Sequence, residues 1–174
     1  PSTNLPHRAE VNLKVANRDW VICDAAGQRI HRCALAALVT EDRQYVDAAV
    51  RQIESLFDEK QWPIWKDQQN INLSGAELRT GMLSHDVAIG FDWLHRMLTP
   101  DQRKWIVDGI VRCGVDLFWK SVEEKVWWVE TPNNWQTCIV GGLGVAGMAL
   151  AGDYERSEEL VQFSLSRMQA YLKE

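Results

Sequence analysis

The sequence predicts an all-α protein, and three observations support this prediction. Apolar residues recur at the helical spacing i, i+3, i+4 and i+7 along nearly the whole chain, whereas no stretch alternates apolar and polar residues as a strand does. Helix-start signals stand at Ser74 and Glu77, and again at Thr99, Pro100 and Gln102. With 174 residues, 46% hydrophobic and 25% charged, the chain is long and apolar enough for one globular domain with a substantial core.

The first two helices form the first predicted pair. One runs from about Ala26 to Val39 and has on one face Ile30, Cys33, Ala34, Ala37 and Leu38. Thr40 is expected to cap a second helix, with acidic residues in its first turn. That helix ends near Asp58 and has on one face Tyr45, Ala49, Ile53, Leu56 and Phe57. The segment 59–72, EKQWPIWKDQQNIN, is expected to be an aromatic loop.

The third and fourth predicted helices differ in how much of their surface is apolar. The third runs from the Ser74 and Glu77 capping box through Leu98, and one of its faces carries Ala76, Leu83, Val87, Phe91, Leu94 and Leu98. Its opposite face carries Leu78, Met82, His85, Ile89, Asp92, Trp93 and Arg96. The fourth, which starts at Thr99, has a single apolar stripe of Ile106, Ile110, Cys113 and Leu117. We therefore expect the third to be an inner helix covered on both faces and the fourth to be an outer helix.

The same alternation returns at the end of the chain. Residues 138–151, CIVGGLGVAGMALA, are apolar all round, whereas the final helix, from about Tyr154, has one apolar side. Repeated pairs of antiparallel inner and outer helices build either an open solenoid or a closed α/α toroid. We expect residues 1–174 to form a single helical domain that is an incomplete part of an (α/α) toroid. Its uncovered apolar flanks would permit self-association.

Three glycines in the last inner helix fit the G-x-G-x-x-G spacing of a dinucleotide-binding turn: Gly142, Gly144 and Gly147. That motif requires a strand before the glycines and another after them, but the residues beyond Gly147 predict a turn and an amphipathic helix. A glycine inside a helix costs about 1 kcal/mol relative to alanine. We therefore interpret these glycines as positions where a neighbouring helix packs closely, on the side that carries Val140, Gly144, Gly147 and Ala151.

Charge and composition argue against several kinds of partner. The net charge is −5 and no basic cluster occurs, so nucleic acid is not an expected partner. The apolar run at the last inner helix is shorter than the ~20 residues that span a bilayer, so no membrane span is expected. The four cysteines show no metal-ligand spacing, and we expect no metal, cofactor or disulfide framework. No signal-peptide pattern opens the sequence.

Tryptophan is the unusual component of the composition, with nine residues in the chain. Its flat ring can fill a core or provide a platform for sugar rings. Five of the nine stand in or beside predicted loops, which favours ligand stacking over burial at helix ends: Trp62, Trp65, Trp127, Trp128 and Trp135.

Polar residues open the glycine-bearing helix. Either Thr131 caps it with Pro132 in the first position, or Asn133 caps it with Gln136 reaching back. Both assignments place an amide side chain, that of Asn133 or Asn134, at the positive end of a helix, which suits a carboxylate or a sulfate. The alternative interpretation is that the asparagines only cap the helix.

Two motifs in this region point to a known family. The run LSGAELRTGMLSHDVAIGFDWLHRMLTPDQRKWIVDGIV contains Phe91-Asp92-Trp93-Leu94-His95 before its Thr-Pro cap, and NNWQTCIVGGLGVAGMALA begins at Asn133. Together they resemble the toroid domain of the heparinase II/III-like and alginate lyase-like polysaccharide lyases. In that family an inner helix ends in a YDWLY-type segment and an Asn-Asn pair opens the next inner helix. The resemblance covers about residues 73–174 and implies a periplasmic or secreted protein.

The resemblance implies β-elimination next to a uronic acid in an acidic polysaccharide or oligosaccharide. The proton alpha to the carboxylate is removed and the oxygen at C4 is expelled, which requires the carboxylate charge to be neutralised. Asn134, and after it Asn133, are the expected catalytic amides. The expected substrate-binding residues are Trp135, Gln136, His85, Trp127 and Trp128. Some members carry His directly after the Asn pair, where this chain has a tryptophan that cannot take a proton.

In the family, a tyrosine after the next outer helix acts as base and acid, and a β-sandwich domain supplies a further histidine. We expect neither within this chain, which by itself would be inactive. Tyr45 and Tyr171 fall on helix faces with apolar neighbours, and Tyr154 falls in a turn. His85 is either a cavity-lining residue, with Asp92 as its candidate partner, or a buried structural histidine.

Two other functions remain open on the sequence alone. A non-catalytic carbohydrate-binding or structural helical module would use the tryptophans without breaking a bond. A glycoside hydrolase toroid would need paired carboxylates on inner helices. Asp86 and Asp92 are the available inner-helix acids, but no second inner helix supplies a partner.

Overall fold

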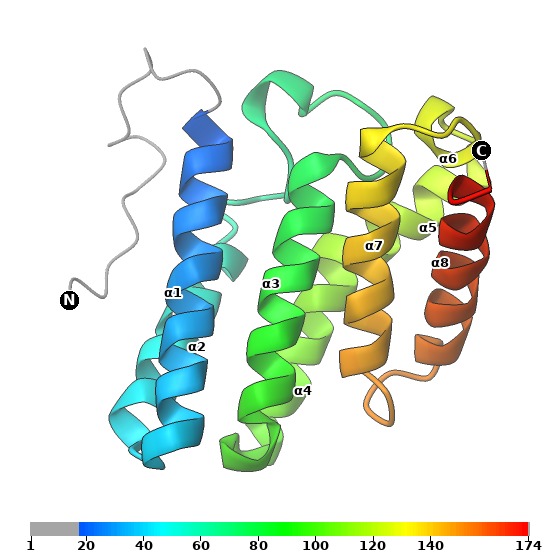
Figure 1. Cartoon of the computed structure of the whole chain (residues 1–174). Helices are drawn as coiled ribbons and strands as arrows, with labels where there is room; N and C mark the ends of the chain where they lie inside the picture. The colour runs from blue at the N-terminus through cyan, green and yellow to red at the C-terminus, as the bar shows by residue number, and fades with distance from the viewer. Residues whose placement is uncertain (1–17, 174) are drawn as a thin grey trace.

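Helices arranged in two layers make up the protein. The computed structural model describes residues 18–173, in which no strand occurs, so the all-α prediction is confirmed. The inner layer consists of α1 (Arg18–Thr40), α3 (Leu78–Leu94) and α7 (Asn134–Ala149), which run side by side in the same direction (Figure 1). Among residues 18–173, none of the helices combines the length and the hydropathy needed to cross a bilayer.

The outer layer runs back in the opposite direction. It contains α2 (Arg43–Phe57), α4 (Pro100–Ile110), α5 (Asp116–Glu123) and α8 (Ser157–Tyr171), with the single turn α6 (Trp127–Glu130) leading into α7. Helix α1 pairs with α2 and α7 pairs with α8, while α3 lies between α1 and α7. The predicted alternation of inner and outer helices is therefore present in three successive pairs.

Helices α4 and α5 are one continuous rod interrupted by a π-helical turn at Val111–Val115. On the α4 side, Trp105 packs edge-on against Phe57 of α2, with ring centroids 5.2 Å apart. On the α5 side, Phe118 packs edge-on against Phe163 of α8, at 5.4 Å. The two halves of the rod thus contact different helical pairs.

Helix α3 has its two apolar faces at the predicted positions, but only one of them is buried, whereas both were expected to be covered. The face that carries Leu83, Val87 and Phe91 is fully buried against the outer layer. The opposite face, with Met82, His85, Ile89 and Trp93, is only half-buried. Within residues 18–173 no helix packs over it, so this face forms the open surface of the inner layer rather than a second buried face.

Where the sequence offered a capping signal, at α2, α3, α4 and α7, it located the helix start to within a few residues. Thr99 and Gln102 form the predicted capping box at the start of α4. At α2 the cap is Asp42 rather than Thr40, because Glu41 takes a left-handed conformation with φ 57° and α1 continues through Thr40. Helix α1 also begins at Arg18, earlier than the predicted Ala26, and α8 begins at Ser157 rather than near Tyr154.

The capping box of α3 uses Glu77 and Thr80 instead of the predicted Ser74 and Glu77. Glu77 is fully buried, and its Oε1 accepts the backbone N–H groups of Asp67 at 2.9 Å and Arg79 at 2.8 Å. Thr80 in return accepts the backbone N–H of Glu77. Burial, followed by the neighbouring Asp67 carboxylate, raises the pKa of the Glu77 carboxyl above its ordinary value of 4.5.

Glu77→Gln is expected to remove a pH dependence of stability. The folded protein keeps the Glu77 proton at pH values where the unfolded chain has released it, so this group lowers the unfolding free energy as pH rises from 4.5 through the raised pKa. The glutamine retains an acceptor oxygen but does not titrate. Urea unfolding at a series of pH values measures the free energy of unfolding of both proteins. The value for the variant minus that for the wild type should increase as pH rises, and a difference that does not change with pH would contradict the prediction.

Gly142, Gly144 and Gly147 of α7 are packing positions, as predicted, but the closest approach is at Gly142, outside the predicted side with Gly144 and Gly147. A Cβ on Gly142 would overlap the carbonyl oxygen of Gly81 in α3, and one on Gly81 would lie 2.6 Å from the Cys138 carbonyl oxygen. Gly144 and Gly147 face α8, where a Cβ would lie 2.8 Å and 2.9 Å from side-chain carbons. The glycines thus let α7 approach α3 on one side and α8 on another.

Candidate functional site

At the N-terminal end of α7 the two asparagines have different roles. Asn133 is the N-cap: its Oδ1 accepts the backbone N–H groups of Trp135 at 2.8 Å and Gln136 at 3.1 Å. Its amide nitrogen donates to the carbonyl oxygen of Thr131. Of the two capping assignments, the structure therefore has the one with Asn133. With both ends of its amide engaged, Asn133 fixes the turn before α7.

Asn134 is the first residue of α7, and its side chain is exposed. Within residues 18–173 its amide group has no hydrogen-bond partner, while its backbone carbonyl accepts the Thr137 hydroxyl. Asn134 shares a helix face with Val145 and Met148, which line a hollow of about 180 Å³ together with Ile89 of α3. The free amide therefore lies on the open surface of the inner layer.

An aromatic pair stands beside Asn134. The rings of Trp127 and Trp135 lie 5.3 Å apart between centroids, at an angle of 53°. Trp127 is 56% exposed and Trp135 is half-buried. Two of the three predicted substrate-binding tryptophans thus present ring surface at the end of α7 where Asn134 lies.

The other two predicted binding residues of this loop are buried. Trp128 is buried, and its indole N–H donates to the carbonyl oxygen of Ala76 at 3.2 Å. The Gln136 amide donates to the carbonyl oxygens of Trp128 and Val129, at 3.3 Å and 2.7 Å, instead of reaching back to the cap. Neither side chain is available to a ligand at the surface, so both hold the loop in place.

Trp62 and Trp65 also serve the core instead of a ligand surface. Both are buried, and the Trp65 indole N–H donates to the carbonyl oxygen of Leu56 at 2.9 Å. Its ring stacks on Phe57, with centroids 5.6 Å apart. The loop that carries them folds inward because these rings cover the end of α2.

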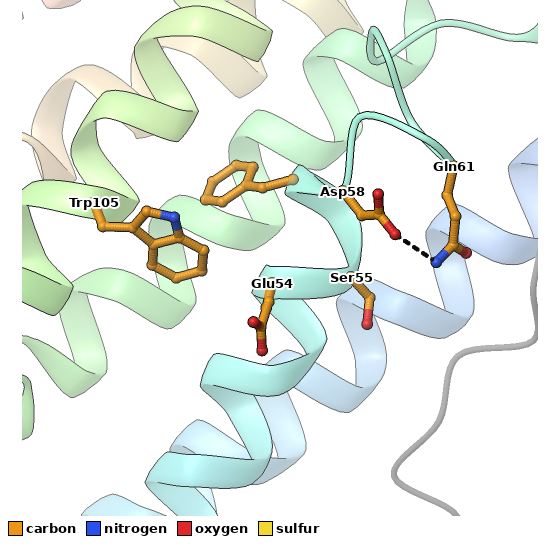
Figure 2. Close-up of a pocket in the computed structure, with 6 residues that line it drawn as sticks. Glu54, Ser55, Asp58, Gln61 and Trp105 are labelled. Carbon is orange, nitrogen blue, oxygen red and sulfur yellow. Dashed lines mark hydrogen bonds between the residues drawn. The ribbon is translucent and has the colours of Figure 1, made fainter.

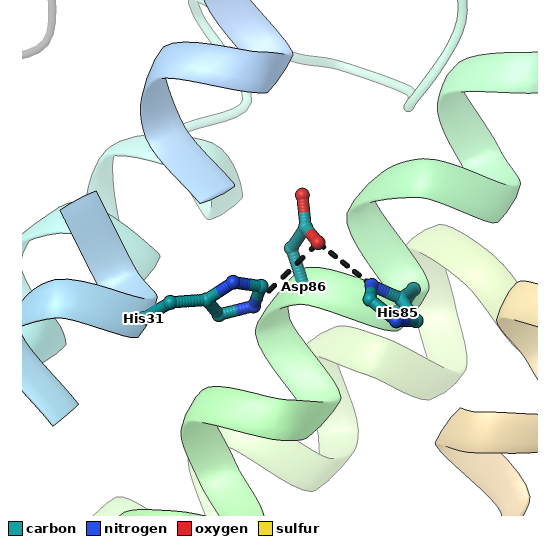
Figure 3. Close-up of side chains that lie close together, drawn as sticks. All are labelled: His31, His85 and Asp86. Carbon is teal, nitrogen blue, oxygen red and sulfur yellow. Dashed lines mark hydrogen bonds and ion pairs between the residues drawn. The ribbon is translucent and has the colours of Figure 1, made fainter. Parts of the chain in front are cut away.

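His85 lies on the open face of α3, with 41% of its side chain exposed. Its Nδ1 is 2.7 Å from Oδ1 of Asp86, so Asp86 is its partner and not the predicted Asp92. Asp86 points toward α1, where a Cβ on Gly27 would overlap its carboxylate. From α1, Nε2 of His31 lies 3.5 Å from the same Asp86 oxygen, so two imidazoles from two helices converge on one carboxylate (Figure 3).

Sequence reasoning missed His31 because its role depends on how α1 packs against α3. The available signal was the i, i+4 pair of Gly27 and His31, which places a small residue and an imidazole on one helix face. The cluster of His31, His85 and Asp86 is defined by this packing.

The histidine cluster and Asn134 are separate points on the inner surface. Gly81 of α3 lies level with Cys138 and Ile139 of α7. At 1.5 Å per residue, His85 then lies about 12 Å further along the helix axes than Asn134. The two predicted site residues therefore share a surface without sharing one reaction centre.

A second hollow lies on the outer layer. About 460 Å³ in volume, it is lined by Trp105 of α4 and the end of α2, including Glu54 and Asp58 (Figure 2). Gln61 donates to the Asp58 carboxylate at 3.0 Å. The two carboxylates make this hollow a poor match for an acidic ligand.

The described cysteines are free thiols, and none contributes to the cluster of His31, His85 and Asp86. Burial raises the pKa of the Cys113 thiol to about 11, so this thiol stays protonated near neutral pH. It behaves as the small buried apolar residue that the sequence predicted.

No family model and no curated protein matches the chain. The geometry of the inner surface is therefore the basis for a functional assignment.

Proposed function

We propose that the inner surface of α1, α3 and α7 binds a glycan that contains uronic acid, and that the chain is the toroid portion of a polysaccharide lyase. The observation that carries the proposal is the free, exposed amide of Asn134 at the N-terminal end of an inner helix. The neighbouring rings of Trp127 and Trp135 offer a surface on which a sugar ring can stack.

The chemistry follows from the position of the amide. The Asn134 N–H group can donate to a uronate carboxylate, and the positive end of the α7 dipole favours the same charge. Neutralising the carboxylate makes the alpha proton easier to remove and stabilises the enolate-like intermediate. Asn133, which fixes the turn, is a positioning residue. The family resemblance assigns the base and acid to a tyrosine after the final helix, so ligand binding is the direct readout for these 174 residues.

Asn134→Ala is expected to weaken the binding of alginate or glycosaminoglycan oligosaccharides by at least about tenfold, because one hydrogen bond to a charged group is lost. Calorimetric titration of the chain with defined oligosaccharides measures this. Stability should change by no more than about 0.5 kcal/mol, since the Asn134 side chain is exposed.

Asn133→Ala provides the comparison for stability. It removes the cap of α7 and should lower the unfolding free energy by about 1 kcal/mol. If no uronate oligosaccharide binds to the folded wild type, the proposal is wrong. If the affinity is unchanged in Asn134→Ala but binding is lost in Trp135→Ala, a non-catalytic carbohydrate-binding module would be favoured instead. A product absorbing in the near ultraviolet, formed from a uronate polymer, would demonstrate the lyase reaction directly.

A further inference from the structure

Three potential metal ligands meet between α1 and α3. One ligand atom from each of His31, His85 and Asp86 lies within 4.8 Å of the other two. The Asp86 oxygen is 2.7 Å from Nδ1 of His85 and 3.5 Å from Nε2 of His31. Donor atoms around a four-coordinate zinc ion, with bonds of about 2.0–2.2 Å, lie about 3.3–3.6 Å apart, so small side-chain rotations suffice to surround an ion.

One ring nitrogen of His31 lacks the hydrogen bond that a buried polar atom normally makes. Nε2 of His31 is buried and has no hydrogen-bond partner among the described residues. Buried polar atoms of this kind are uncommon in folded proteins, because leaving one without a partner costs free energy. A cation between this nitrogen and the Asp86 oxygen would give the nitrogen a partner.

The backbone keeps room for the carboxylate. Gly27 of α1 faces Asp86 directly, and any larger residue would occupy the space that the carboxylate fills. The cluster is also accessible: the exposed side-chain fractions are 29% for His31, 41% for His85 and 15% for Asp86. An ion could therefore enter from the open surface of the inner layer and keep a water molecule as a further ligand.

We propose that His31, His85 and Asp86 bind a single first-row divalent ion of the zinc class. Two imidazoles and one carboxylate form a donor set that suits zinc, whereas magnesium and calcium prefer oxygen ligands alone. Binding requires neutral imidazoles whose protons lie on the nitrogens that face away from the ion. The site goes beyond the proposed function and does not depend on a glycan, since it lies about 12 Å from Asn134 along the helix axes.

The test is a calorimetric titration of the whole chain, freed of metal with a chelator, with Zn²⁺. One equivalent should bind to the wild type, and Mg²⁺ should not bind. His31→Gln and His85→Gln should each lower the zinc affinity by about 100-fold. Gly27→Ala keeps all three ligands but displaces the carboxylate, and should lower the affinity at least about tenfold. Far-ultraviolet circular dichroism in chelator checks that each variant is folded.

His95 provides the matched control. It pairs with Asp153 at 2.8 Å on the surface, in a His-Asp pair without a second imidazole. His95→Gln should leave the affinity unchanged. Absence of zinc binding by the wild type at submillimolar concentrations would overturn the proposal. So would affinities of His31→Gln and Gly27→Ala equal to that of the wild type.

Discussion

Gly142→Ala is expected to lower the free energy of unfolding by about 3 kcal/mol, at the upper end of the range for overpacked positions. The added methyl group would overlap the carbonyl oxygen of Gly81, which belongs to the backbone of α3. A flexible side chain could move aside, but here two helices would have to separate. Chemical denaturation monitored by circular dichroism measures the loss.

The neighbouring glycine is a stringent control for this prediction. A Cβ on Gly141 meets no atom within 4 Å, so Gly141→Ala only improves helix propensity. It should raise the unfolding free energy by about 0.5–1 kcal/mol. Two identical substitutions, one residue apart, should therefore have opposite signs. If both variants are stabilised, the close contact between α3 and α7 is wrong.

Trp65→Ala is expected to cost about 3–5 kcal/mol, because it leaves a large cavity under the loop after α2. The substitution also removes the hydrogen bond to Leu56 and the stacking on Phe57. The Trp65 carbonyl oxygen accepts the Thr80 hydroxyl, so displacement of this segment should also disturb the start of α3. Urea unfolding and hydrogen exchange of the first turns of α3 measure the two effects.

Trp127→Ala provides the comparison for Trp65→Ala. Trp127 is 56% exposed, and its removal should change stability by no more than about 0.5 kcal/mol. A similar loss of stability from both substitutions would contradict the assignment of Trp65 to the core and Trp127 to the surface.

Features that depend on neighbours in the sequence were predictable. The buried face of α3 and the box at Thr99 and Gln102 follow from side-chain spacing along one helix, and the structure has both. The cap at Asn133 was one of two assignments that the sequence left open. The turn geometry decides against Thr131, which ends the α6 turn, because Oδ1 of Asn133 is the group that accepts the free N–H groups of Trp135 and Gln136.

Features that depend on packing between helices were not predictable from one sequence. The pairing of Asp86 with both His85 and His31 arises because Gly27 leaves room for the carboxylate. Spacing along α3 alone pointed to Asp92, because adjacent residues on a helix ordinarily diverge. The burial of Trp62 and Trp65 could not be predicted either, since it depends on the direction in which their loop folds.

The π-helical turn at Val111–Val115 inserts one extra residue between α4, which contacts α2, and α5, which contacts α8. Each residue of a regular helix turns the chain by about 100°, so the additional residue rotates everything after it by that amount. This rotation is what aims Phe118 at α8 while Trp105 faces α2. A regular helix of the same composition would turn one of these two rings away from its partner, so the extra residue is what lets one rod contact two helical pairs.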